Sequence, residues 1–183
     1  YRGIPNCMVI DSRREDVKRR LVQSFSSDLI RFYYGDELIG NEVGAAAKNV
    51  VGIAAGFLDG KGLSSLKGAL MSRGTREVAR LIKAMGGNEL SAYGLCHLGD
   101  YEATVFSPYS HNRQFGESFI RGETYTDLAE GYYTVEALVL LGQRHGVELP
   151  ICQAVHRVLY CGADPMQELR ALLDRNLTRE FGE

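Results

Sequence analysis

The chain has 183 residues, of which 45% are hydrophobic and 24% charged, and its formal net charge is -2. These values suit one globular core, or one domain with part of another, and exclude the basic surface that binds nucleic acid or anionic membranes. No apolar run is long enough for membrane insertion. The four cysteines are scattered and no histidines have metal-ligand spacing, so we expect reduced thiols, a cytoplasmic location and no metal site.

Residues 1–36 predict a strand, a helix and a second strand. Residues 7–10 form a short apolar run, and residues 29–34 are aromatic and apolar. Between them, residues 15–25 place apolar side chains at helical spacing, with Lys18 among the basic residues of the opposite face. Two strands and a helix bury little apolar surface alone. We therefore interpret this segment as the end of a larger parallel α/β sheet that begins upstream.

From residue 37 to residue 183 the pattern is helical. Apolar periodicity, with glycine or proline at most boundaries, predicts helices over residues 38–58, 66–85, 89–98, 111–120, 134–144, 151–160 and 166–174. The chain is thus predicted to be mainly α, with an all-helical domain following a β-α-β remnant.

Two groups of residues in this domain could carry chemistry. On the long helix, Lys48 and Asn49 share a face with small residues that could leave room for a ligand. A lysine whose ammonium group reaches water at the helix edge explains the same pattern equally well. Asp100 follows a glycine that we expect to end a helix, and Thr104 comes one turn later. Such an aspartate is more often a turn or capping residue than a catalytic one.

A third group precedes the helix at residues 111–120. A helix N-terminus offers free N–H groups and the positive end of the dipole, so this turn could bind a phosphate. An ordinary capped helix is an equally good interpretation. The group consists of Ser110, His111, Asn112 and Arg113.

Together, these groups resemble a known family. The run E-V-G-A-A-A-K-N-V at 42–50 is similar to the lysine-bearing helix of NAD(P)-dependent glycerol-3-phosphate dehydrogenases. G-D at 99–100 followed by S-H-N-R-Q-F-G at 110–116 resembles their substrate loop, and E-G at 130–131 resembles a cofactor contact. The resemblance extends from about residue 4 to residue 175.

The resemblance implies a Rossmann domain that ends with residues 1–36, and a helical domain at 37–183 of the type found at the C-terminus of 6-phosphogluconate dehydrogenase. It implies interconversion of sn-glycerol 3-phosphate and dihydroxyacetone phosphate with NAD or NADP, which supplies glycerophospholipid synthesis. This chain would carry the substrate and proton-transfer half, be inactive alone and be able to form a homodimer. Lys48 and Asp100 would be catalytic. The implied substrate contacts are Lys48, Asn49, Asp100, Thr104, Ser110, His111 and Asn112, and the implied cofactor contacts are His111, Leu128 and Glu130.

One departure from the family affects the phosphate contact. The family has arginine where this chain has His111, and histidine is shorter and cannot form a bidentate contact with a phosphate. We expect either that Arg113 compensates or that phosphate binding is weaker and pH-dependent.

Two other interpretations stay open. A related 2- or 3-hydroxyacid dehydrogenase would have asparagine four residues after the lysine, where this chain has Gly52. A stand-alone helical module for binding or dimerisation fits the chain as it stands, because a glycine-rich dinucleotide-binding motif is missing from it.

Overall fold

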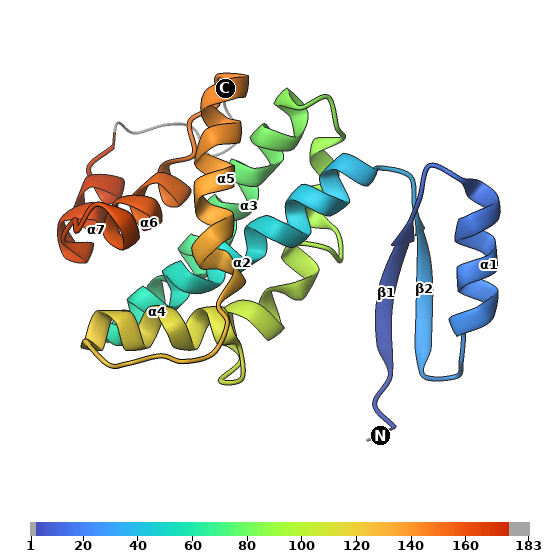
Figure 1. Ribbon diagram of the computed structural model, residues 1–183, viewed down its shortest axis with the longest axis horizontal. Coiled ribbons are helices and arrows are strands. Elements are labelled where there is room, and N and C mark those ends of the chain that lie inside the picture. The colour runs from blue at the N-terminus through green and yellow to red at the C-terminus, as the bar shows by residue number, and fades with distance from the viewer. Residues whose placement is uncertain (1–2, 176–183) are drawn as a thin grey trace.

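The computed structural model describes residues 3–175, which form a small β-α-β unit beside a larger group of helices (Figure 1). The small unit consists of β1 (Asn6–Asp11), α1 (Glu15–Phe25) and β2 (Ile30–Gly35). β1 and β2 pair in parallel along their whole length, with α1 as the crossover between them. This arrangement confirms the predicted order of strand, helix and strand.

Lys18 departs from the sequence prediction. It was expected on the polar face of α1, but only 4% of its surface is exposed. Its Nζ donates to the carbonyl oxygen of Gly35 at 2.9 Å and to Asp36 Oδ1 at 2.6 Å. The hydrogen bond to Asp36 raises the pKa of Lys18. The amine is buried because the end of β2 provides both a carbonyl and a carboxylate to receive it.

The helical part is built around α2, which contacts α3, α4, α5 and α6. Ala47, Val50 and Ile53 on α2 are fully buried at the centre of the apolar core. Each such valine or isoleucine stabilises the fold by about 1.5–3 kcal/mol. The predominance of helix confirms the predicted fold class. The helices are α2 (Leu38–Gly60), α3 (Lys67–Ala84), α4 (His111–Arg121), α5 (Glu130–His145), α6 (Pro150–Tyr160) and α7 (Pro165–Leu173).

Glycines bring α4 and α2 into backbone contact. A Cβ atom on Gly56 of α2 would collide with the carbonyl oxygen of Arg113, and one on Gly116 of α4 would collide with that of Ile53. Neither position can accept a side chain unless the helices separate. These two glycines, one on each helix, thus set the distance between α2 and α4, whose start carries part of the candidate site.

The segment between α3 and α4 differs most from the sequence prediction. The prediction of a single helix at residues 89–98 is wrong. Two short 3-10 turns, η2 (Glu89–Tyr93) and η3 (Leu98–Asp100), occur instead, because the Gly99 N–H turns back to the Gly94 carbonyl at 2.9 Å. A π-helical turn, η4 (Glu102–Phe106), and a loop lead into α4. A further 3-10 turn, η1 (Ser64–Leu66), precedes α3.

α5 begins one turn earlier than predicted, at Glu130 instead of residue 134. The additional turn is stabilised by Asn112, whose side-chain oxygen accepts a hydrogen bond from the Gly131 N–H at 2.8 Å. No helix within residues 3–175 is long and apolar enough to cross a membrane.

Candidate active site

Lys48 and Asp100 form the centre of the candidate site. Lys48 lies midway along α2, Asp100 ends η3, and the Lys48 Nζ is paired with the Asp100 Oδ2. The side chains are 24% and 38% exposed, so the pair lies at the margin of the core with one side open. The sequence could not determine whether Lys48 was a packing residue. The structure presents its amine to solvent next to a carboxylate, where a ligand could exchange a proton with it.

Thr104 connects the turn of Asp100 to α2. Its hydroxyl donates to the carbonyl oxygen of Asp100 at 2.8 Å, and the residue is only 6% exposed. A Cβ on Gly52 would be 2.9 Å from the Thr104 methyl carbon and 3.2 Å from the Cβ of Asn112. The expectation that the small residues next to Lys48 leave room for a ligand is therefore wrong at Gly52, because protein atoms fill that space.

The starts of α4 and α5 converge on α2 next to Lys48. Asn49 Nδ2 donates to Glu130 Oε2 at 3.0 Å, and the Gly131 N–H donates to Asn112 Oδ1 at 2.8 Å. A Cβ on Gly131 would be 2.6 Å from the carbonyl oxygen of Asn49. This close approach places Glu130, itself exposed to solvent, over the residue that follows the candidate catalytic lysine.

The other predicted site residues lie at the edge of this arrangement. Ser110 caps α4 by accepting the N–H of the third helical residue at 3.3 Å. The ring of His111 is 61% exposed, and its Nδ1 is 3.0 Å from the hydroxyl of Tyr125 and 3.9 Å from Asp127. Leu128 is 66% exposed in the segment before α5. Tyr125 was not predicted, since its separation from His111 follows no helical or strand spacing.

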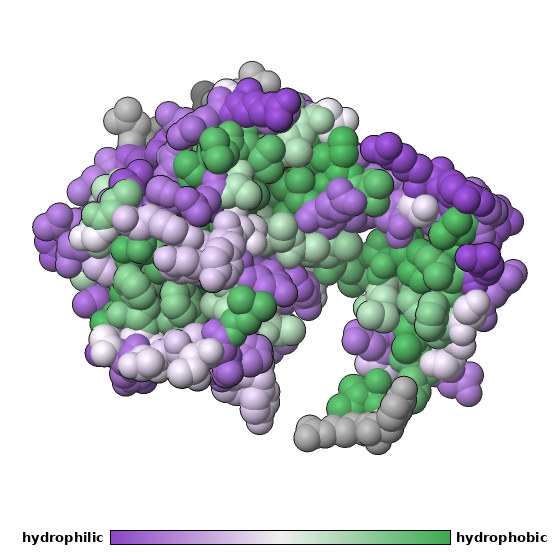
Figure 2. Space-filling model, viewed as in Figure 1, coloured by the Kyte–Doolittle hydropathy of each residue, from purple (hydrophilic) through white to green (hydrophobic). Residues whose placement is uncertain are grey.

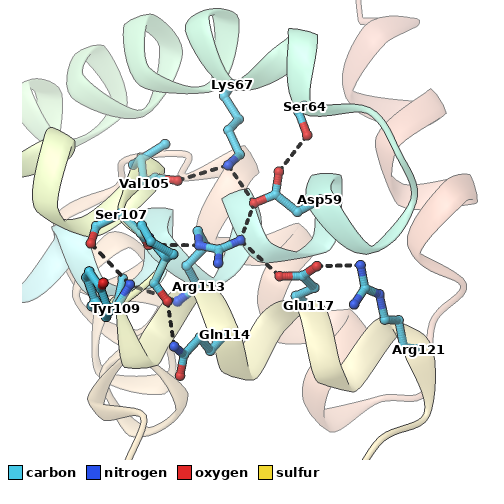
Figure 3. A network of polar contacts seen from close by, with 12 residues as sticks. Asp59, Ser64, Lys67, Val105, Ser107, Tyr109, Arg113, Gln114, Glu117 and Arg121 are labelled. Atoms are coloured by element: carbon cyan, nitrogen blue, oxygen red, sulfur yellow. Dashed lines mark hydrogen bonds and ion pairs between the residues drawn. The ribbon is translucent and has the colours of Figure 1, made fainter.

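Arg113 points into the protein, where two carboxylates bind it (Figure 3). Its Nη1 is 2.6 Å from Asp59 Oδ2 and 2.9 Å from Glu117 Oε2, and its Nε donates to the Ser107 carbonyl oxygen at 2.9 Å. This geometry contradicts the expectation that Arg113 compensates for the histidine at position 111.

The same network fixes the segment that leads into α4. Lys67 Nζ lies 2.5 Å from Asp59 Oδ2 and donates to the carbonyl oxygen of Val105 at 3.1 Å. Gln114 donates to the carbonyl oxygen of Pro108 at 2.5 Å. Burial opposes ionisation of Asp59, yet hydrogen bonds from Lys67 and its neighbours lower the pKa of this carboxyl. The charged network therefore ties η4 and the following loop to α2, α3 and α4.

Two fully buried polar residues next to the ion pair were overlooked in the sequence. The His97 ring lies edge-on to the Tyr101 ring, with centroids 4.8 Å apart, and neither residue is exposed to solvent. Their spacing of one helical turn was the available signal, but it stands in a segment without regular periodicity.

A large groove elsewhere on the molecule, lined by α3, α6, α7 and the C-terminal part of α2, shares no residue with this site. Within residues 3–175, no cluster of three or more histidine, cysteine, aspartate or glutamate side chains could hold a metal ion. We therefore define the candidate site by its convergent polar groups on α2, α4 and α5.

Comparison with known proteins identifies the family to which the chain is similar. Residues 37–170 match the family described as "NAD-dependent glycerol-3-phosphate dehydrogenase C-terminus". A glycerol-3-phosphate dehydrogenase [NAD(P)+] of Thermus thermophilus is 44% identical over 172 residues, which cover 91% of this chain and 53% of the relative. One from Maricaulis maris is 38% identical, over 97% of this chain and 56% of the relative. The chain thus spans about half the length of these curated relatives.

Solved structures show the same fold. The crystal structure of glycerol-3-phosphate dehydrogenase from Coxiella burnetii superposes with a TM-score of 0.89 at 31% identity, and the match covers 94% of this chain and 56% of that one. The Plasmodium falciparum glycerol-3-phosphate dehydrogenase has a TM-score of 0.82 at 18% identity, over 97% of this chain and 54% of that one, and so agrees in fold.

Proposed function

This chain belongs to the NAD-dependent glycerol-3-phosphate dehydrogenase family, and we propose that it provides the substrate and proton-transfer half of such an enzyme. The proposed reaction interconverts sn-glycerol 3-phosphate and dihydroxyacetone phosphate with NAD or NADP. The observation that carries the proposal is the partly exposed Lys48–Asp100 ion pair, on which polar residues from three helices converge.

We propose that residues 1–36 end a nucleotide-binding domain whose remaining strands belong to the upstream half of the protein. Hydrophobic side chains gather over this part of the surface (Figure 2). Met8, Phe25 and Tyr34 are 48%, 61% and 51% exposed. A two-stranded sheet with one covering helix does not stabilise itself well, so further strands are the natural cover for these side chains. The residues from 37 onward then form the second domain.

In the proposed reaction Lys48 is the general acid and base. Reduction of the ketone requires one proton on the C2 oxygen, and the Lys48 ammonium group would donate it; oxidation would return it to the amine. The carboxylate of Asp100 orients that amine and carries the balancing negative charge. Asn49, on the same helix face, would hydrogen-bond the substrate. The open side of the ion pair is where the substrate carbonyl would lie.

The phosphate of the substrate would lie at the start of α4, where Ser110, His111 and Asn112 meet the positive end of the helix dipole. When bound, a nicotinamide cofactor exchanges a hydride with the substrate carbon. Glu130 and Leu128 suit such a ligand, because both side chains are exposed and Glu130 is bonded to Asn49. We propose that His111, as the resemblance implies, contacts both the phosphate and the cofactor.

The alternative hydroxyacid dehydrogenase finds no support at position 52. An asparagine there would require space that Thr104 and Asn112 occupy. The supply of glycerophospholipid synthesis, a cytoplasmic location and a homodimer stay predictions from the sequence.

The test is an assay of the full-length protein with dihydroxyacetone phosphate and either NADH or NADPH. We expect turnover with one or both cofactors, and loss of turnover by about two orders of magnitude or more in Lys48→Ala, because general acid catalysis contributes 10²–10⁴-fold. Lys83→Ala is the matched control, since Lys83 is an exposed lysine of α3 paired with Glu89. An inactive wild-type protein, or a fully active Lys48→Ala variant, would contradict the proposal.

A further inference from the structure

We infer that His97 and Tyr101 are positioning residues that hold Asp100 against Lys48 through a buried hydrogen-bonded relay, an inference that rests on the proposed function. The relay runs from the Tyr101 hydroxyl through the imidazole of His97 to the carbonyl oxygen of Gly44. Gly44 lies on α2, one helical turn before Lys48. The relay therefore connects the turn that carries Asp100 to the helix that carries its partner.

The distances define a continuous chain of bonds. The Tyr101 hydroxyl oxygen is 2.6 Å from His97 Nε2, and His97 Nδ1 is 2.9 Å from the Gly44 carbonyl oxygen. Asp100 lies between the two side chains in sequence, and its own N–H donates to the His97 carbonyl oxygen at 3.1 Å. The two rings therefore anchor the residues on either side of Asp100, and the backbone bond ties Asp100 to the first of them.

The chemistry of the partners determines where each proton lies. A backbone carbonyl can only accept, so His97 Nδ1 must carry a hydrogen and donate it to Gly44. The Nε2 of a neutral ring then has a free lone pair, which accepts the hydroxyl proton of Tyr101. Burial lowers the pKa of His97 to about 4 and raises the pKa of Tyr101, so both groups remain neutral in the working range of an enzyme. One tautomer, and hence one direction of the relay, is stable.

Packing alone does not account for this arrangement. Fully burying an imidazole and a phenol group is costly unless each finds a hydrogen-bond partner, and apolar residues of similar size would fill the same space at lower cost. His97 can approach α2 closely because residue 44 is glycine. A Cβ on Gly44 would lie only 3.1 Å from the His97 Cβ. The directional bonds give what apolar packing lacks: a fixed orientation of the η3 turn relative to Lys48.

The test compares two single-hydroxyl deletions in the full-length protein. Tyr101→Phe keeps the ring and removes the hydroxyl that bonds to His97 and also to the Thr75 side chain. We expect kcat to fall about tenfold with the KM for dihydroxyacetone phosphate unchanged, because catalytic groups misplaced by a fraction of an ångström lose rate before they lose binding. Tyr160→Phe is the matched control: it removes a hydroxyl bonded to the Tyr132 carbonyl oxygen at 2.7 Å, away from Lys48. Its kcat should stay within twofold of the wild type.

A second pair of variants separates positioning from a purely structural role. His97→Gln keeps a donor and an acceptor and should retain more kcat than His97→Leu, which keeps neither. Equal kcat in these two variants, a Tyr101→Phe variant with wild-type kcat, or equal loss in Tyr101→Phe and Tyr160→Phe would overturn the inference. If the wild type turns over and Lys48→Ala does not, these results bear on the relay alone. A wild type without activity would instead refute the proposed function, and the inference with it.

Discussion

Acidification is expected to destabilise the chain through His97. Burial lowers the pKa of this residue from its usual 6.5 to about 4, although the hydrogen bond to Gly44 opposes the change. Above pH 6.5 the ring is neutral in both the folded and the unfolded chain. Between 6.5 and about 4 the unfolded chain binds a proton that the folded chain does not, so the free energy of unfolding falls as the pH falls. The difference between the two pKa values corresponds to about 3 kcal/mol.

Urea unfolding of the wild type and of His97→Gln, each near pH 7 and near pH 4, measures this contribution. Carboxylates titrate in both proteins, so their effects cancel in the comparison. We expect the loss of unfolding free energy between these pH values to be about 3 kcal/mol smaller in His97→Gln, which has no titrating ring. An NMR titration of the His97 ring in the folded wild type provides an independent check. Equal losses in both proteins, or a titration midpoint near 6.5, would refute the reasoning.

Three further substitutions test other parts of the structure. Glu77→Ala should lower the free energy of unfolding by about 3 kcal/mol in urea denaturation, because the buried carboxylate accepts the first two N–H groups of α6 that follow its proline. The exposed Glu136→Ala serves as the control, and equal effects would contradict the assignment. Gly131→Ala should raise the KM for the nicotinamide cofactor, since the new methyl group would press on the Asn49 carbonyl oxygen; an unchanged KM would show that this approach does not shape the site. His111→Arg should lower the apparent KM for dihydroxyacetone phosphate because arginine can contact a phosphate with two donors, and an unchanged KM throughout pH 6–8 would argue against a phosphate contact there.

The long helices could be predicted because their ends carry local chemical signals. Pro150 and Pro165 each occupy the first turn of a helix, and the side chain of Asp164 accepts the Gln167 N–H at 2.8 Å. The segment between α3 and α4 has no such signal. Its turns are held by contacts between glycines and by Lys67, which reaches from another helix to the Val105 carbonyl. Periodicity cannot reveal bonds of that kind.

The candidate site was predictable only in part. Lys48 and Asp100 are far apart in sequence, and no local pattern links them. Only the resemblance to a family predicted that they act together. Compensation by Arg113 was left open in the sequence because guanidinium chemistry fits a phosphate and a carboxylate equally well. Glu117, one turn later on the same helix, could be recognised in the sequence as a carboxylate partner for Arg113. Asp59 comes from α2 and could be recognised as its partner only in the structure.

The central claim is that the Lys48 amine transfers the proton, and chemical rescue tests it most directly. The account predicts that full-length Lys48→Ala reduces dihydroxyacetone phosphate very slowly, and that added small primary amines restore kcat in proportion to their concentration and in an order that follows their pKa values. Lys83→Ala, assayed in parallel, should need no amine. A Lys48→Ala variant that retains the wild-type kcat without any amine would contradict the claim.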